Sequence, residues 1–166
     1  VPNVATGGDV RTLVGYVKYP PLGNRGFSPY TRAAEYTPDR AKELTRAGNE
    51  NVLVVVHVEG EAALQRVDEI LAVREVDVVF IGRFDISKSL GVPGEVDHPK
   101  VAEAVKNVAG RISAAGKVAG TIANTEEELR RFLDWGIRYV TYGADCSILR
   151  GAYSTICRSF RSMRKR

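Results

Sequence analysis

The chain has 166 residues, of which 44% are hydrophobic and 27% charged, so its composition is that of a globular protein with one core. It contains no run of about 18 or more apolar residues, and its first residues, VPNVATGGD, lack the basic end and apolar core of a signal peptide. These features exclude a membrane-spanning helix. They predict a cytoplasmic protein, with no membrane partner, that forms a single domain over residues 1–166.

The net charge of +4 is concentrated at the C-terminal end, where the last nine residues carry no acid. The basic residues there are Arg158, Arg161, Arg164, Lys165 and Arg166. Cations at the end of a helix interact favourably with its dipole, and no basic surface interleaved with aromatic residues accompanies them. We therefore expect a solvated helix end and no nucleic-acid partner.

The only two cysteines, Cys146 and Cys157, fall on one predicted helix. Their heights along the helix axis would differ by about 16 Å, which is too far for a disulfide. We expect reduced thiols that serve as packing residues.

The first third of the chain mixes short elements with a long irregular segment. Val1–Val4 is typical of the end of a strand, and Asp9–Lys18 has the apolar spacing of a short helix. Tyr19–Gly26 contains paired prolines and two glycines, which predict irregular structure. Residues 29–47 are expected to be partly helical, with a break near Pro38 and an end at the following Gly-Asn pair.

The stretch from Val52 to Leu90 organises the chain. Two apolar runs, Val52–Val58 and Val76–Gly82, flank a helical pattern over Glu61–Val73, which predicts a strand–helix–strand unit with parallel strands. Parallel strands end at the same edge of a sheet, so Glu59 and Asp85 should emerge side by side there. Two carboxylates at this edge predict a site for a hard divalent cation.

The remaining elements continue the alternation of helices and strands. They are a helix from Pro99 to about Ala115 capped by Asp97 or His98, a strand at 117–122, a helix opened by the capping box Thr125–Glu128, a strand at 137–142 and a last helix from about Ser147. Alternation of this kind predicts a parallel α/β fold.

Phosphate-binding glycine motifs that often mark open parallel sheets are absent, which favours a barrel. A complete (β/α)8 barrel needs about 250 residues. Four strands are evident, and a fifth is possible near Arg25–Ser28. The predicted fold is therefore a (β/α)8 TIM barrel that is N-terminally incomplete, with four to five strands.

Several segments together resemble the HpcH/HpaI aldolase family. They are YPPLGNRGF (19–27), VHVEGEAALQRVDEIL (56–71), VVFIGRFDISKSLGVPGEVDHPKV (78–101) and YGADCSIL (142–149). The most specific parts are the V-x-E and G-x-x-D-(I/L)-S segments, whose acids lie 26 residues apart. The resemblance implies a metal-dependent class II aldolase, a carbon–carbon lyase that cleaves or forms 4-hydroxy-2-oxo acids through a pyruvate enolate, as the 4-hydroxy-2-oxoheptanedioate and 2-dehydro-3-deoxyglucarate aldolases do.

The resemblance also implies roles for individual residues. Glu59 and Asp85 match the family's metal ligands, for Mg²⁺, Mn²⁺ or Co²⁺. The main-chain amides of Phe84 and Asp85 match those that bind the substrate carboxylate, and His57 stands where the family usually has a glutamine that contacts the substrate. Arg83 and Phe84 replace a common proline and alanine.

The partners that the resemblance implies are pyruvate as the 2-oxo acid, an aldehyde, and further copies of the chain in a homo-oligomer in which the C-terminal helix packs on a neighbour. The family places its proton-accepting histidine and an oxyanion-stabilising arginine on early strands, before the segment that matches Val1. No catalytic base is therefore assigned in this chain.

Other interpretations of these residues remain open. Glu59 also suits an exposed helix start, Asp85 a helix cap, and His57 either a hydrogen-bonded core position, a substrate contact or a third metal ligand. Arg25 is expected to be structural, and Asp145 to cap the last helix. At the level of function, the alternatives are a non-catalytic barrel fragment that assembles with a partner, or a relative of the acyl-CoA lyases.

Overall fold

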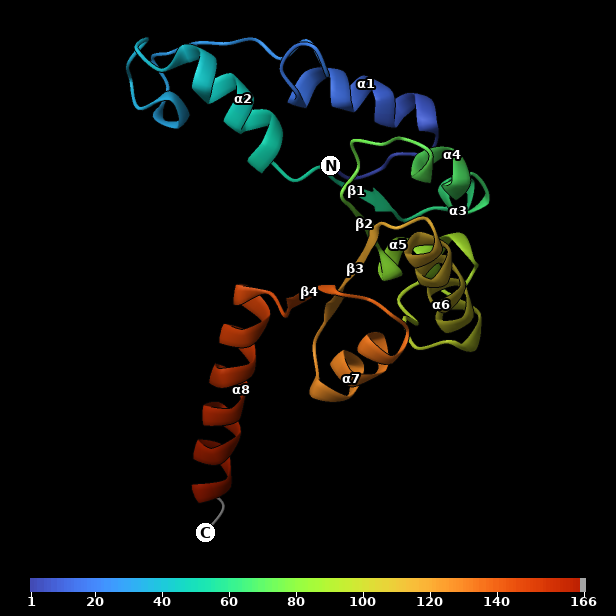
Figure 1. Ribbon diagram of the computed structural model, residues 1–166. Helices are drawn as coiled ribbons and strands as arrows, with labels where there is room; N and C mark the ends of the chain where they lie inside the picture. Colours follow the sequence, from blue (N-terminus) through green and yellow to red (C-terminus); the bar gives the residue numbers. More distant parts are fainter. Residues whose placement is uncertain (165–166) are drawn as a thin grey trace.

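The computed structural model describes residues 1–164 and shows a curved parallel sheet with helices along one side (Figure 1). The strands are β1 (Val55–Val58), β2 (Val78–Ile81), β3 (Val118–Ala123) and β4 (Tyr139–Tyr142). They lie in the order β1-β2-β3-β4, and every neighbouring pair is parallel. Within the described residues there are four strands, and the predicted parallel α/β architecture is confirmed.

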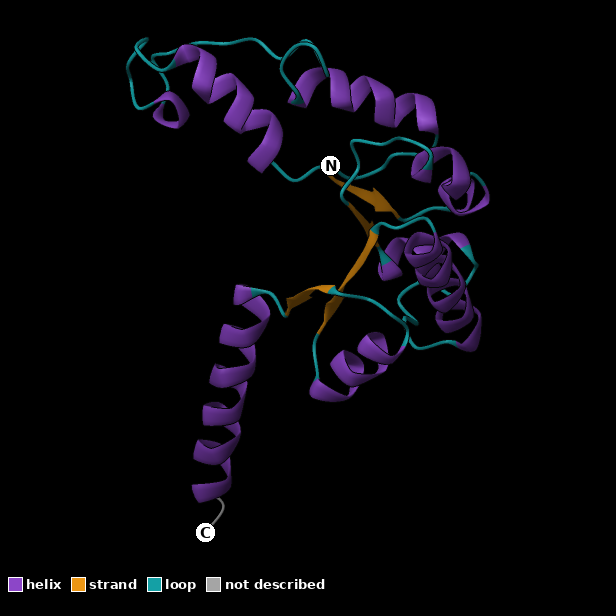
Figure 2. Cartoon of the chain, in the orientation of Figure 1, coloured by secondary structure: helices purple, strands orange, loops and turns teal. Residues whose placement is uncertain are grey.

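The helices are α1 (Gly7–Val17), the 3-10 turn η1 (Arg32–Ala34), α2 (Ala41–Asn51), α3 (Glu61–Gln65), α4 (Val67–Leu71), α5 (Arg83–Ser89), α6 (Pro99–Ala114), α7 (Glu126–Asp134) and α8 (Asp145–Met163). Of these, α3 to α7 connect the strands and lie along one side of the sheet, as Figure 2 shows. Helix α6 begins as predicted, because His98 is its N-cap and accepts a hydrogen bond from the Lys100 amide. Thr125 caps α7 in the same way, through the Glu128 amide.

The core lies between the sheet and these helices. Alternate residues of β1, Val56 and Val58, are fully buried, as are Val79 and Ile81 of β2, and they pack with Val105 and other apolar residues of the helices. This period of two follows from the pleat of a strand, which sends successive side chains to opposite faces. The helix-facing side of β1, β2 and β3 is therefore buried, whereas β4 has no buried residue.

The opposite face of the sheet carries a layer of aromatic rings in register. His57 pairs with Phe80 along β1 and β2, and their rings stack with centroids 4.6 Å apart. Phe80 meets Tyr139 of β4 edge to face at 6.4 Å, across Gly120 of β3. A Cβ at Gly120 would lie 3.0–3.1 Å from both rings, so this glycine leaves the space that the aromatic layer fills.

The predicted fifth strand near Arg25–Ser28 is wrong. This segment is irregular, and the Arg25 amide donates to the Lys18 carbonyl at the end of α1. Its backbone is thereby engaged with the helix that precedes it rather than with a strand.

Other element boundaries also differ from the prediction. The helix predicted over 61–73 is two short helices, because Arg66 leaves the helical region with φ −106° and ψ 18°. Helix α2 continues through Gly48 to Asn51, since the Asn49 side chain bonds the backbone of Tyr19 instead of ending the helix. Val1–Val4 is not a regular strand, but its first carbonyl accepts from the His57 amide at 2.9 Å, so it runs beside β1.

Helix α8 extends away from the sheet and buries none of its residues (Figure 1). Both cysteines on it are unpaired, as predicted, but they are exposed, so the expectation that they are packing residues is wrong. Asp145 is the first residue of α8 rather than its cap, which is Ala144. Lys165 and Arg166 of the basic end lie outside the described residues. None of the helices in residues 1–164 has the length and apolarity that crossing a membrane requires.

Lys117 ties the loop before β2 to the start of β3. Its ammonium donates to the carbonyls of Val73 at 2.8 Å and Val76 at 2.7 Å. Burial lowers the pKa of Lys117, while the carboxylates of Asp77 and Glu75 act in the opposite direction. The lysine thus satisfies carbonyls that no helix or strand ladder uses.

Replacing Lys117 by methionine keeps the aliphatic chain and removes these hydrogen bonds. We expect the free energy of unfolding to fall by about 1–3 kcal/mol, because the part-buried carbonyl of Val76 loses its donor and that of Val73 keeps only the Val76 amide. Urea denaturation followed by circular dichroism measures this change. Lys106→Met, at an exposed position of α6, is the control and should leave stability within about 0.5 kcal/mol; equal effects of the two substitutions would contradict the role given to Lys117.

Candidate metal and substrate site

The two predicted carboxylates line one pocket at the carboxyl edge of the sheet. This pocket has a volume of about 470 Å³ and is bounded by Asn3, Glu59, Gly60, Asp85, Lys88 and Ser89. Glu59 directly follows β1, and Asp85 lies in the first turn of α5, just after β2. The parallel pairing of β1 with β2 brings the two together. The structure therefore places both acids at one site.

Glu59 is the better fixed of the two carboxylates. One oxygen, Oε1, accepts a hydrogen bond of 2.7 Å from the Asn3 amide, and the side chain is 18% exposed. The other oxygen, Oε2, lies 3.7 Å from Nδ1 of His57. Glu59 is therefore not the freely exposed helix-start acid of the alternative interpretation.

Gly82 supplies the space beside Glu59. A Cβ built on Gly82 would lie 2.6 Å from the Glu59 Cβ and 2.9 Å from its Oε2. Real side chains do not approach so closely, so any other residue at position 82 would displace the carboxylate. The glycine of the G-x-x-D segment thus has a steric role in the site.

Asp85 is held less tightly. Its side chain is 58% exposed and lies 4.0 Å from the ammonium of Lys88, one turn further along α5. Helix α5 begins at Arg83 and its N-cap is Gly82, so Asp85 does not cap it. The Phe84 side chain is 58% exposed and is not among the residues that line the pocket, so its bulk does not narrow the site.

The donor set suits a hard divalent cation with few protein ligands. Across residues 1–164 there is no cluster of three or more histidine, cysteine, aspartate or glutamate side chains of the kind that encloses a metal. Two carboxylates in an open pocket match instead a cation that keeps several positions for water and substrate, as Mg²⁺ does. The Gly82 cradle beside Glu59 and the common pocket are the structural features that fit such an ion.

His57 lies beside Glu59 without lining the pocket. It stacks on Phe80, and its Nδ1 faces the Glu59 carboxylate. The imidazole of His57 is therefore next to Glu59, on the face of the sheet that carries the aromatic rings. Arg25, in contrast, lies over the Tyr19 ring at 4.8 Å, in agreement with its predicted structural role.

Four residues of the pocket were not identified from the sequence as site residues: Asn3, Gly60, Lys88 and Ser89. Asn3 acts through its main-chain amide, which any residue except proline provides, so its side chain carries no signal. Lys88 is three residues after Asp85, and this helical spacing is the signal that was available.

The pKa of His57 is lowered by burial, and the neighbouring Glu59 carboxylate opposes this shift. We expect NMR titration of the imidazole to give a midpoint below the ordinary 6.5, and Glu59→Gln to lower it further. Because the pKa of His57 is lower in the folded chain than in the unfolded chain, the unfolded chain binds a proton more readily. The stability that neutral His57 contributes is therefore present above pH 6.5, and it is lost as the pH falls towards the pKa of the folded chain. A midpoint above 6.5 would contradict this account.

The chain is similar to known proteins in both sequence and structure. The profile of the family described as HpcH/HpaI aldolase/citrate lyase matches residues 1–152. The chain is 38% identical over 153 residues to the hydroxypyruvate/pyruvate aldolase of Delftia acidovorans, covering 92% of this chain and 56% of that protein. It is 33% identical over 161 residues to a 5-keto-4-deoxy-D-glucarate aldolase of Escherichia coli O6:H1, covering 97% and 62%.

Solved structures give the same result. The HpcH/HpaI aldolase of Desulfitobacterium hafniense DCB-2 superposes with a TM-score of 0.89 at 26% identity, over 97% of this chain and 62% of that one. An HpcH/HpaI aldolase/citrate lyase family protein of Burkholderia cenocepacia J2315 gives a TM-score of 0.88 at 30% identity, over 96% and 63%. The chain thus spans 56% to 63% of the length of these proteins and has the TIM-barrel type of fold. The chain therefore belongs to the HpcH/HpaI aldolase/citrate lyase family.

Proposed function

We propose that this chain forms the metal-binding part of a class II aldolase that cleaves and forms 4-hydroxy-2-oxo acids, with pyruvate as the 2-oxo acid and an aldehyde as its partner. The observation that carries the proposal is the convergence of Glu59 and Asp85 on one pocket at the carboxyl edge of a parallel sheet. The names of the aldolases from Delftia acidovorans and Escherichia coli support this class of reaction.

Each group at the site would have a distinct role. Glu59 and Asp85 would hold a divalent cation, Mg²⁺, Mn²⁺ or Co²⁺, which when bound supplies Lewis-acid stabilisation of the negative charge that develops on the 2-oxo acid. The main-chain amides of Phe84 and Asp85 would hold the substrate carboxylate. His57 lies beside Glu59, just outside the residues that line the pocket. It would contact the substrate from the face of the sheet that carries the aromatic rings, in the place of the family's glutamine.

This assignment predicts the result of metal titrations. Mn²⁺ binding by the wild-type chain, followed by electron paramagnetic resonance, should weaken about 10–100-fold in Glu59→Gln and Asp85→Asn, because each removes an anionic ligand. Exchange of the pyruvate methyl protons in D₂O, followed by NMR, is to be measured with any N-terminal segment of the natural protein restored, because the family's proton acceptor precedes the segment that matches Val1. Under these conditions we expect exchange to require the metal and to be lost in the same variants.

Glu103→Gln is the matched control, since Glu103 is an exposed carboxylate on α6 outside the pocket. It should bind Mn²⁺ as the wild type does. A wild-type chain that binds Mn²⁺ no better than Glu59→Gln would refute the metal site. Metal binding without any proton exchange, measured with the N-terminal segment restored, would favour the alternative of a barrel fragment that assembles with a partner.

We further propose that the chain forms a homo-oligomer through α8. Five apolar residues of this helix recur at alternating steps of four and three: Leu149, Tyr153, Ile156, Phe160 and Met163. This spacing places them on one face, and each is about 60–70% exposed in the single chain. A continuous apolar face of this kind is typical of a helix that packs on another subunit. The exposed free thiols on the same helix support a reducing compartment, the cytoplasm.

Placing a charge in this face should separate the subunits. We expect Ile156→Asp to lower the molar mass measured by light scattering after size exclusion to that of a monomer, because burying an unpaired carboxylate is costly. Ser154→Asp, one residue outside the apolar face, should keep the mass of the wild type. A monomeric wild-type chain would disprove this use of α8.

A further inference from the structure

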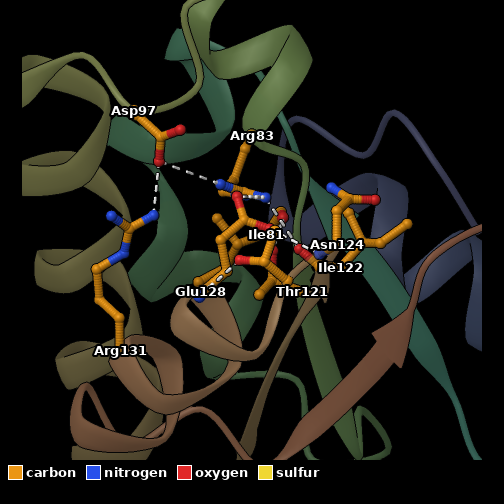
Figure 3. A network of polar contacts seen from close by, with 9 residues as sticks. Ile81, Arg83, Asp97, Thr121, Ile122, Asn124, Glu128 and Arg131 are labelled. Atoms are coloured by element: carbon orange, nitrogen blue, oxygen red, sulfur yellow. Dashed lines mark hydrogen bonds and ion pairs between the residues drawn. The ribbon is translucent and has the colours of Figure 1, made fainter. Parts of the chain in front are cut away.

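Arg83 is a charged residue that the proposed chemistry does not use, yet its side chain is only 2% exposed. It is the first residue of α5, between β2 and the Phe84–Asp85 pair. Its guanidinium extends to β3 and α7, with Nη2 donating to the Ile122 carbonyl at 3.1 Å and lying 2.9 Å from Glu128 Oε1 (Figure 3). A buried arginine is costly unless it is paired, so its position calls for a specific explanation.

Glu128 is fixed at the other end of this contact. Its Oε2 accepts a 2.7 Å hydrogen bond from the Asn124 amide, just beyond β3, and its own amide donates to Thr125. The carboxylate is 12% exposed, and the Phe132 ring of the same helix lies 4.7 Å from the Arg83 guanidinium carbon. Arg83 therefore meets a carboxylate that the backbone already orients.

These side-chain contacts begin where the main-chain ladder stops. The pairing of β2 with β3 ends at Phe80 and Gly120, whereas the pairing of β2 with β1 continues to Ile81. Beyond that point the links from β2 and its turn to β3 include the Thr121 hydroxyl on the Ile81 carbonyl and the two contacts of Arg83. The turn that carries Phe84 and Asp85 is thus anchored on the β3 side by side chains.

The guanidinium of Arg83 does not use all of its hydrogen-bond donors. Within the described chain, Nε and Nη1 of Arg83 are buried without a hydrogen-bond partner, and Nη1 lies 4.0 Å from Asp97, which Arg131 already binds at 2.6 Å (Figure 3). The burial of Arg83 is therefore compensated mainly at Nη2, by the Glu128 carboxylate and the Ile122 carbonyl. These two contacts join the start of α5 to the next βα unit.

We propose that Arg83 is a positioning residue that, through Glu128 and the Ile122 carbonyl, fixes the turn of Gly82 to Asp85 relative to Glu59. The inference rests on the proposed function, because Asp85 and the two amides are site groups only if the pocket binds the metal and the 2-oxo acid. Asp85 is the loosely held partner of the site, whereas Glu59 is fixed by Asn3. A fixed start of α5 would set the geometry of Asp85 without touching substrate.

The test separates positioning from stability by using a charge-neutral pair of substitutions. Arg83→Met leaves Glu128 without its partner and should destabilise the fold. The double variant Arg83→Met with Glu128→Gln removes both charges and should regain a melting temperature near that of the wild type. In this double variant we still expect amide hydrogen exchange over residues 82–90 to be at least about tenfold faster than in the wild type, and Mn²⁺ affinity to be at least about fivefold weaker.

Arg111→Met is the matched control. Arg111 pairs with Asp68 at 2.7 Å and is within 3.5 Å of the Leu64 carbonyl, so it also links a carboxylate and a carbonyl, but away from the pocket. It should leave both readouts unchanged. Where Arg83→Met does not fold by itself, Arg83→Lys, which keeps the charge and one donor, should show an intermediate exchange rate.

Two outcomes would overturn the inference: a double variant with wild-type exchange and wild-type Mn²⁺ affinity, or equal effects of Arg111→Met. Amide exchange needs no metal, so it decides the role of Arg83 in the turn independently. If the wild type shows no Glu59-dependent Mn²⁺ binding but the turn loosens in the double variant, the proposed function fails while the anchoring role of Arg83 stands. If Mn²⁺ binding depends on Glu59 and the turn is unaffected, only the positioning role fails.

Discussion

The pairing of β1 with β2 is the interaction on which the site depends. Parallel strands deliver their carboxyl ends to the same edge, so Glu59 after β1 and Asp85 after β2 meet although they are 26 residues apart. The intervening helices bury Ala63 of α3 and Val67 and Ile70 of α4 against the core and so keep the crossover on one side of the sheet. The candidate cation site is therefore a consequence of βα topology.

The site is asymmetric in how its parts are supported. Glu59 is held at short range by a backbone amide and by the absence of a side chain at Gly82. Asp85 lies in the first turn of α5. This turn is linked through Arg83 to Glu128 of α7, which belongs to the next βα unit. One carboxylate thus depends on local geometry, and the other depends on the packing of the next βα unit.

The two faces of the sheet have different chemistry. Along β1, β2 and β3 the helix-facing side is buried and mainly aliphatic, while the opposite side carries His57, Phe80 and Tyr139 in one register. Side chains in the interior of a (β/α)8 barrel stack in layers of this kind. The layer leads towards the carboxyl edge, where Glu59 follows His57 on the same side of β1.

The sequence by itself determined the parallel α/β class, most element positions, the two carboxylates and the family, because apolar periodicity and the spacing of the acids are local properties of the chain. It did not predict the break at Arg66, the lack of a strand at 25–28 or the burial of Arg83, since each depends on contacts between distant segments. From the sequence alone, an arginine that directly follows a strand is expected to be exposed to solvent. Only the tertiary structure supplies Glu128 and the Ile122 carbonyl, from residues about 40 positions later, and these contacts make its burial possible.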